Sequence, residues 1–187
     1  MIVRSWMVPV GNQEANIHLI ACERTREAAL VDAGGYTEEM REFITARDLQ
    51  LRQVLITHAH YDHVDALEDI IAEHASRVLA STQVSPGAVL LSEGDTVRVG
   101  DLTGRVVKTS GHTPYSISFI FGEEIVFSGD ALFAGSIGGT ASEALKREEI
   151  THVRKKILSL AGSCEIRSGH GPATTVEIER AANPFFV

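Results

Sequence analysis

The segment Thr57 to His63 constrains this chain most strongly, because three histidines and one aspartate stand within six consecutive positions. Its sequence is Thr-His-Ala-His-Tyr-Asp-His, and it directly follows the apolar run 54–56, which predicts a buried strand. Polar side chains at this density are costly to bury unless other groups satisfy them. A divalent metal ion does so, since it binds three or four such donors at about 2.0–2.2 Å. The alternative is a solvated polar loop.

Three later turns carry donors of the same kinds. His112 and His170 each stand beside glycine, in Gly-His-Thr-Pro and Gly-His-Gly-Pro, and Asp130 ends Ser-Gly-Asp after the apolar run 125–127. Glycine next to a donor permits tight turns, so that the backbone can approach an ion closely. The four segments together favour a metal site over a solvated loop.

Chain length predicts a single domain over residues 1–187, because this length suffices for one sizeable core and is short for two. The net charge of −8, from 17 basic and 25 acidic residues, disfavours nucleic acid and anionic membranes as partners. No apolar stretch reaches the ~20 residues that a membrane helix needs, and the first residues lack a signal-peptide pattern. The only cysteines are Cys22 and Cys164, so we expect no disulfide framework and a cytoplasmic location.

Short apolar runs alternate with turn signals and a few helical patterns along the chain. Strands are expected at residues 16–22, 27–32, 53–56, 77–80, 96–99, 104–109, 116–121 and 124–128. Helices are expected after Thr37, after His63 and from Glu148 onward. Mixed strands and helices with donors at strand ends favour helices packed outside layers of strands.

These motifs resemble the metallo-β-lactamase superfamily, and within it the small glyoxalase II-like (hydroxyacylglutathione hydrolase-like) hydrolases. The resemblance rests on His-x-His-x-Asp-His at 58–63, Gly-His-Thr-Pro at 111–114, the run 128–138 and Gly-His-Gly-Pro at 169–172, in family order. It extends over residues 16–186, which is nearly the whole chain. The fold that it implies is α+β, a four-layer αββα sandwich with metals at one edge between the sheets.

The resemblance also implies a role for each donor. It places His58, His60 and His112 around one ion, Asp62, His63 and His170 around a second ion, and Asp130 between the two. Asp62 and Asp130 are the implied catalytic carboxylates. The implied cofactors are two divalent metal ions, with zinc expected and iron or manganese as alternatives. Three neutral imidazoles leave a fourth position open to solvent, and a hydroxide bridging the ions would attack the substrate.

Two departures from the family pattern concern substrate binding. Gly139 stands where the family often carries arginine, so a guanidinium that could hold a substrate carboxylate is absent. Tyr115 stands where glycine is frequent, and its ring would either line the substrate pocket or fill the core. Full-length enzymes that hydrolyse glutathione thioesters carry a C-terminal helical domain. We expect none here, so glutathione specificity does not carry over.

The expected function is a binuclear metal-dependent hydrolase that acts on a small-molecule thioester or ester. One alternative is a persulfide dioxygenase-like enzyme with a single iron on His58, His112 and Asp130, since two histidines and a carboxylate leave positions open for oxygen. A lactonase is a second alternative. A non-catalytic metal-binding protein is the rival from another class, and its signature, a missing ligand, does not occur. The sequence carries no signal for an oligomeric state.

Overall fold

A computed structural model describes residues 1–187, which form two compact units. Unit 1 comprises Met1–Leu91 and Val97–Thr103, and unit 2 comprises Ser92–Thr96 and Gly104–Val187. The single domain expected from chain length stays a prediction. None of the helices has the length and apolar character needed to cross a membrane.

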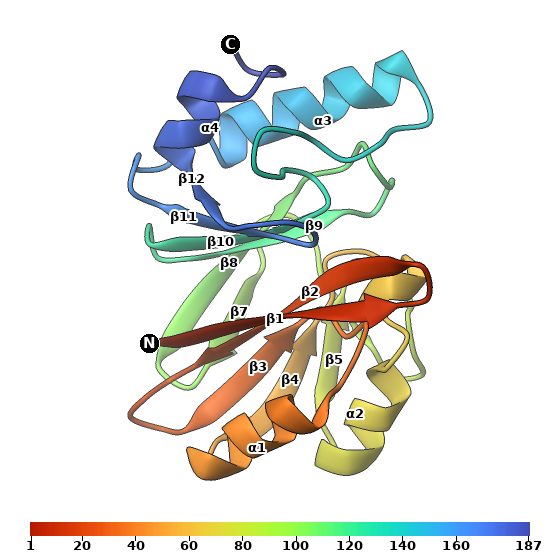
Figure 1. The fold of residues 1–187 in the computed structure, drawn as a ribbon, viewed down its shortest axis with the longest axis vertical. Coiled ribbons are helices and arrows are strands. Elements are labelled where there is room, and N and C mark those ends of the chain that lie inside the picture. The colour runs from red at the N-terminus through yellow and green to blue at the C-terminus, as the bar shows by residue number, and fades with distance from the viewer. The chain divides into compact units, whose positions relative to one another are not determined.

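Unit 1 contains a mixed sheet with the strand order β1-β2-β3-β4-β5-β6 (Figure 1). Its strands are β1 (Ile2–Val10), β2 (Gln13–Ala21), β3 (Glu27–Val31), β4 (Gln50–Leu55), β5 (Arg77–Ala80) and β6 (Val89–Leu90). Neighbouring strands from β1 to β3 are antiparallel, and those from β3 to β6 are parallel. Helices α1 (Glu38–Ala46) and α2 (Leu67–His74) bury Met40 and Ile70 in the core of this sheet.

The second sheet has the order β12-β11-β10-β9-β8-β7. Its strands are β7 (Thr96–Val99), β8 (Leu102–Lys108), β9 (Ile117–Phe121), β10 (Ile125–Gly129), β11 (Glu165–Ser168) and β12 (Thr174–Thr175). Strands β10 and β11 are parallel, whereas β9 is antiparallel to both β8 and β10. In unit 2, helices α3 (Glu143–Lys156) and α4 (Val176–Ala182) contribute Val153 and Val176 to a core with Val126 and Ile166.

All eight predicted strands are present, as β2 to β5 and β7 to β10, and α1 follows Thr37 as predicted. Two helix predictions need correction. Helix α3 begins at Glu143, not near Glu148, because the side chain of Ser142 caps it by accepting a 3.3 Å hydrogen bond from Leu145 N. Helix α2 begins at Leu67, since the short 3-10 turn η1 (Tyr61–His63) and a further turn come first.

Candidate metal ligands

In unit 1 the donor-rich segment starts where β4 ends. Strands β3 and β4 are parallel and pair Val31 with Leu55, so their carboxyl ends lie at the same edge of the sheet. Beyond the strands, the N–H of Asp32 donates to the carbonyl of Leu55 at 2.9 Å, and the N–H of Ala33 donates to the carbonyl of His63 at 2.8 Å. These backbone hydrogen bonds fix the chain after β3 against the donor-rich segment.

Asp32 organises the buried side of this segment. Its carboxylate accepts hydrogen bonds from Thr57 N at 2.8 Å and from Thr57 Oγ1 at 2.9 Å, and it lies 2.9 Å from His63 Nδ1. Thr57 Oγ1 in turn lies 3.1 Å from His58 Nδ1. One ring nitrogen of each histidine is therefore oriented by a polar group of the protein. The sequence motifs assign no role to Asp32, although its position at the end of a buried strand was a usable signal.

Glycine is required at position 34, because the turn after β3 passes very close to the backbone of η1. A Cβ atom at Gly34 would lie 1.7 Å from the carbonyl oxygen of Asp62. No side chain fits at that distance, so the turn after β3 can contact η1 directly only with glycine at this position.

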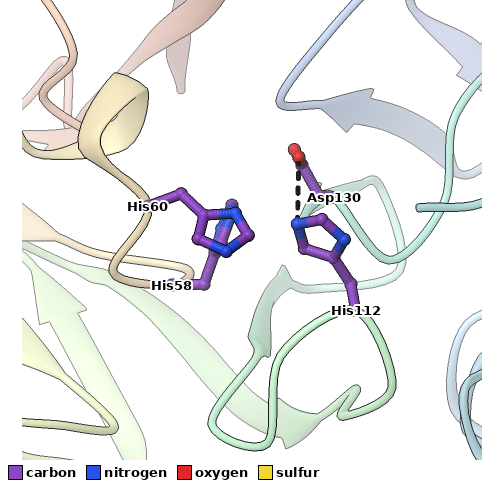
Figure 2. Close-up of side chains that lie close together, drawn as sticks. All are labelled: His58, His60, His112 and Asp130. Carbon is purple, nitrogen blue, oxygen red and sulfur yellow. Dashed lines mark hydrogen bonds and ion pairs between the residues drawn. The ribbon is translucent and has the colours of Figure 1, made fainter. Parts of the chain in front are cut away.

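The other ring nitrogens in unit 1 face further donors. His58 Nε2 lies 3.1 Å from His60 Nδ1, and Figure 2 shows both rings on the loop that follows β4. His63 Nε2 lies 3.7 Å from Asp62 Oδ2. His58, Asp62 and His63 are buried, whereas His60 is exposed. All four residues belong to groups that could hold a metal ion.

In unit 2 three strand ends carry the remaining donors. Strands β10 and β11 are parallel, and β8 runs in the same direction because both β8 and β10 are antiparallel to β9. The carboxyl ends of all three strands therefore lie at one edge of the sheet. Asp130 directly follows β10, His170 stands two residues after β11, and His112 follows β8.

The donors of unit 2 converge on the carboxylate of Asp130. His112 Nε2 lies 3.5 Å from Asp130 Oδ2, a contact drawn as a dashed line in Figure 2, and His170 Nε2 lies 3.4 Å from the same oxygen. The opposite nitrogen of His112, Nδ1, lies 2.7 Å from the carbonyl oxygen of Gly139. Asp130 is buried and both histidines are partly buried. The imidazole of His112 is thus oriented in the same manner as those of His58 and His63.

The spacing within each unit fits donors to a shared ion. Two donors bound to one tetrahedral ion at about 2.1 Å lie roughly 3.4 Å from each other. The imidazole–carboxylate separations of 3.4, 3.5 and 3.7 Å match this value. They exceed the usual range of about 2.7–3.2 Å for an N–H···O hydrogen bond. Nitrogen and carboxylate donors suit zinc, iron and manganese, so the residues present fit a divalent metal.

Glu149 is a buried polar residue next to these donors, in the stretch where the sequence predicted the start of a helix. It lies within α3 with 0% of its surface exposed, and its carboxyl group accepts a hydrogen bond from the backbone N–H of His112. Burial raises the pKa of Glu149 to about 8, and the nearby charge of Asp130 acts in the same direction.

The two residues singled out for substrate binding lie at the surface of unit 2. Tyr115 is 58% exposed, so the alternative that its ring fills the core is wrong. Gly139 lines a hollow of about 280 Å³ together with Thr140, Lys146 and Phe185. Lys146, which the sequence did not single out, therefore supplies a cation close to the position where the family often carries arginine.

The chain belongs to the metallo-beta-lactamase superfamily. The family model of that name matches residues 10–81 and 65–163. The resemblance found in the sequence is therefore confirmed, and so is the predicted α+β fold, which solved structures of similar sequence share.

Three individual proteins are similar to this chain over nearly its whole length. The chain is 29% identical to the hydroxyacylglutathione hydrolase GloC of Haemophilus influenzae over 204 residues, which covers 96% of each chain. It is similar in structure to ETHE1 from Myxococcus xanthus, with a TM-score of 0.88 and 29% identity, covering 98% of this chain and 84% of that one. It is also similar to TTHA1623 in a di-iron-bound form, with a TM-score of 0.76 and 27% identity, covering 96% and 99%.

Proposed function

We propose that this protein is a binuclear metal-dependent hydrolase that cleaves thioester or ester bonds. One observation carries the proposal: His58, His63 and His112 each have one ring nitrogen oriented by a polar group while the other faces a further donor. Such outer contacts are typical of metal-binding histidines, whose tautomer and ring orientation they set. The similarity to a hydroxyacylglutathione hydrolase supports the class of reaction.

The proposed ligands are His58, His60 and His112 for one ion, Asp62, His63 and His170 for the other, and Asp130 as the bridge. Similarity to a protein solved with two iron ions supports a pair of ions and keeps iron as an alternative to zinc. When bound, the ions supply a hydroxide nucleophile near neutral pH and a positive charge that stabilises the developing oxyanion.

The protein's own residues prepare the donors for this chemistry. The carbonyl of Gly139 holds a proton on His112 Nδ1, so that Nε2 keeps its lone pair. Asp32 has the same effect on His63 through Nδ1. Because a thiolate is a good leaving group, thioester hydrolysis needs no strong general acid. We place the exposed ring of Tyr115 on the substrate side of the centre.

Parallel assays separate this function from its rivals. Protein loaded with zinc and, separately, with iron is given S-lactoylglutathione, a small acyl thioester, an acyl lactone or glutathione persulfide, and both hydrolysis and oxygen consumption are recorded. The proposal expects thioester hydrolysis without oxygen consumption. Oxygen-dependent consumption of the persulfide with no thioester hydrolysis would indicate the mononuclear iron alternative, and lactone cleavage alone would indicate a lactonase.

Substrate scope should be broad, with less than about 100-fold preference in kcat/KM for S-lactoylglutathione over a small acyl thioester, which is about 2.7 kcal/mol of transition-state binding. Lys146 is a flexible point charge that lacks the planar fork of arginine. Its ammonium lies 3.9 Å from Glu143, and its side chain is 37% exposed. Exposed ion pairs contribute only about 0.2–1 kcal/mol. A larger preference would contradict the prediction and reveal an unrecognised glutathione pocket.

A substitution at Gly139 tests whether the lack of an arginine at this position causes the broad substrate scope. A Cβ atom there meets no other atom within 4 Å, so a longer side chain has room. Gly139→Arg should raise the preference for the glutathione thioester, because the guanidinium can bind a carboxylate with two hydrogen bonds. Gly139→Gln is the matched control of similar shape without the charge. An equal change of preference in both variants would exclude the charge as the cause.

A further inference from the structure

Glu149 is a buried acid with incomplete hydrogen bonding. Its carboxyl group accepts hydrogen bonds from the backbone N–H groups of His112 and Gly138, while its Oε1 atom has no hydrogen-bond partner. The other buried acid of unit 2 on a helix, Glu179, differs. Its two carboxylate oxygens accept hydrogen bonds from Thr174 Oγ1, Gly135 N and Asn183 Nδ2. Both carboxylate oxygens of Glu179 have hydrogen-bond partners, as expected for a structural residue, whereas one oxygen of Glu149 has none.

The two backbone groups that Glu149 binds both belong to segments that position the imidazole of His112. His112 belongs to the turn after β8, and its ring contacts the carbonyl of Gly139 through Nδ1. Gly138 directly precedes that carbonyl in the loop after Asp130. Glu149 therefore fixes the backbone that carries the imidazole and also the loop that orients its ring.

The turn before His112 packs directly on this part of α3. A Cβ atom at Gly111 would lie 2.2 Å from Cβ of Glu149, and the φ of +151° disfavours other residues there as well. The turn can therefore contact the helix at Glu149 without an intervening side chain. The position of His112 thus depends directly on the residue at position 149.

A purely structural role explains this arrangement poorly. A buried carboxyl oxygen without a partner destabilises the folded state. Accepting the two backbone N–H groups does not by itself require this second, unpartnered oxygen. Buried groups that lower stability are expected where function requires them.

We propose that Glu149 is a positioning residue that holds His112 in the orientation needed to bind metal. The inference rests on the proposed function in one respect, namely that His112 is a ligand. It goes beyond that function because it assigns the ligand's geometry to a helix residue outside every metal-binding motif of the chain.

Two variants, Glu149→Leu and Glu149→Gln, test the proposal, with Glu179→Gln as the matched control. Zinc affinity is measured by competition with a chromophoric chelator, and Tm is measured on the metal-free proteins. Glu149→Leu should lower zinc affinity by about 10–100-fold, the usual effect of removing an outer contact of a metal site. It should also lower Tm, because the backbone N–H groups of His112 and Gly138 lose their acceptor. Glu149→Gln should lose less affinity, because the amide oxygen can still accept one hydrogen bond.

The control should separate stability from metal binding, because Glu179→Gln disturbs a satisfied structural network and contacts no ligand. It should lower Tm and leave zinc affinity unchanged. Unchanged zinc affinity in both Glu149 variants would overturn the positioning role and leave the proposed function intact. A wild-type protein that binds no divalent metal would instead reject the proposed function. If the leucine variant does not fold, the affinity of the glutamine variant decides the question.

Discussion

Asp130→Asn should weaken the binding of both metal ions together and reduce hydrolysis by about 10³-fold or more, equivalent to losing roughly 4 kcal/mol of metal-based transition-state stabilisation. The same Asp130 oxygen lies 3.5 Å from His112 Nε2 and 3.4 Å from His170 Nε2. We assign those two histidines to different ions, so a bridging carboxylate is the simplest role for Asp130. A neutral amide is a poorer donor to a divalent cation and removes one negative charge from between two positive ones.

Metal content and kcat of this variant provide the measurement. Asp101→Asn is a suitable control, since Asp101 is an exposed carboxylate paired with Arg24, and its loss should leave both quantities unchanged. Retention of two metal equivalents with near-normal turnover in Asp130→Asn would reject the bridging role.

Removing the metal should abolish hydrolysis while the secondary structure persists. In unit 1, hydrogen bonds within the protein hold the donor-rich segment, from Thr57 to Asp32 and from the Ala33 N–H to the His63 carbonyl. Metal binding should still raise Tm, because a ligand present at 1,000 times its Kd stabilises the folded state by about 4 kcal/mol.

Dialysis against a chelator, followed by circular dichroism and a thioesterase assay, tests this expectation, and added zinc should restore activity. The same chelator already saturated with zinc serves as the control and should have no effect. Full activity in protein shown to be free of metal would contradict a metal-dependent reaction.

The candidate donors could be named from the sequence because each proposed metal-binding turn carries its histidine or aspartate in a short local motif. The supporting groups could not be predicted in the same way. The hydrogen bonds of Asp32 depend on the parallel pairing of β3 with β4, a contact between segments separated by helix α1. Periodicity within either strand does not specify which strands pair.

Glu149 was missed for a different reason. Two consecutive acids suggested a helix start, where carboxylates are usual and exposed. The better signal was Ser142, because a serine before a helical pattern is a preferred cap and moves the start one and a half turns earlier. When the helix starts at Glu143, Glu149 falls in the middle of the helix and not in its first turn, so it no longer has to be exposed.

Strand β1 was also not predicted, although Trp6, Val8 and Val10 alternate with more exposed residues as in a half-buried strand. The proline at position 9 argues against an interior strand, yet β1 lies at the edge of its sheet, where proline is tolerated. Strands β6 and β12 have two residues each, which is too short for a periodic signal.

The number and spacing of metal ions in fully loaded protein is the most direct test of the binuclear centre. Crystals of zinc-loaded protein, measured at the zinc absorption edge, should show two ions per chain about 3.5–4 Å apart, as in two-metal hydrolytic sites. Elemental analysis of the same sample should give two equivalents of zinc. One equivalent at saturation, with Asp62 and His170 not bound to metal, would contradict the binuclear centre.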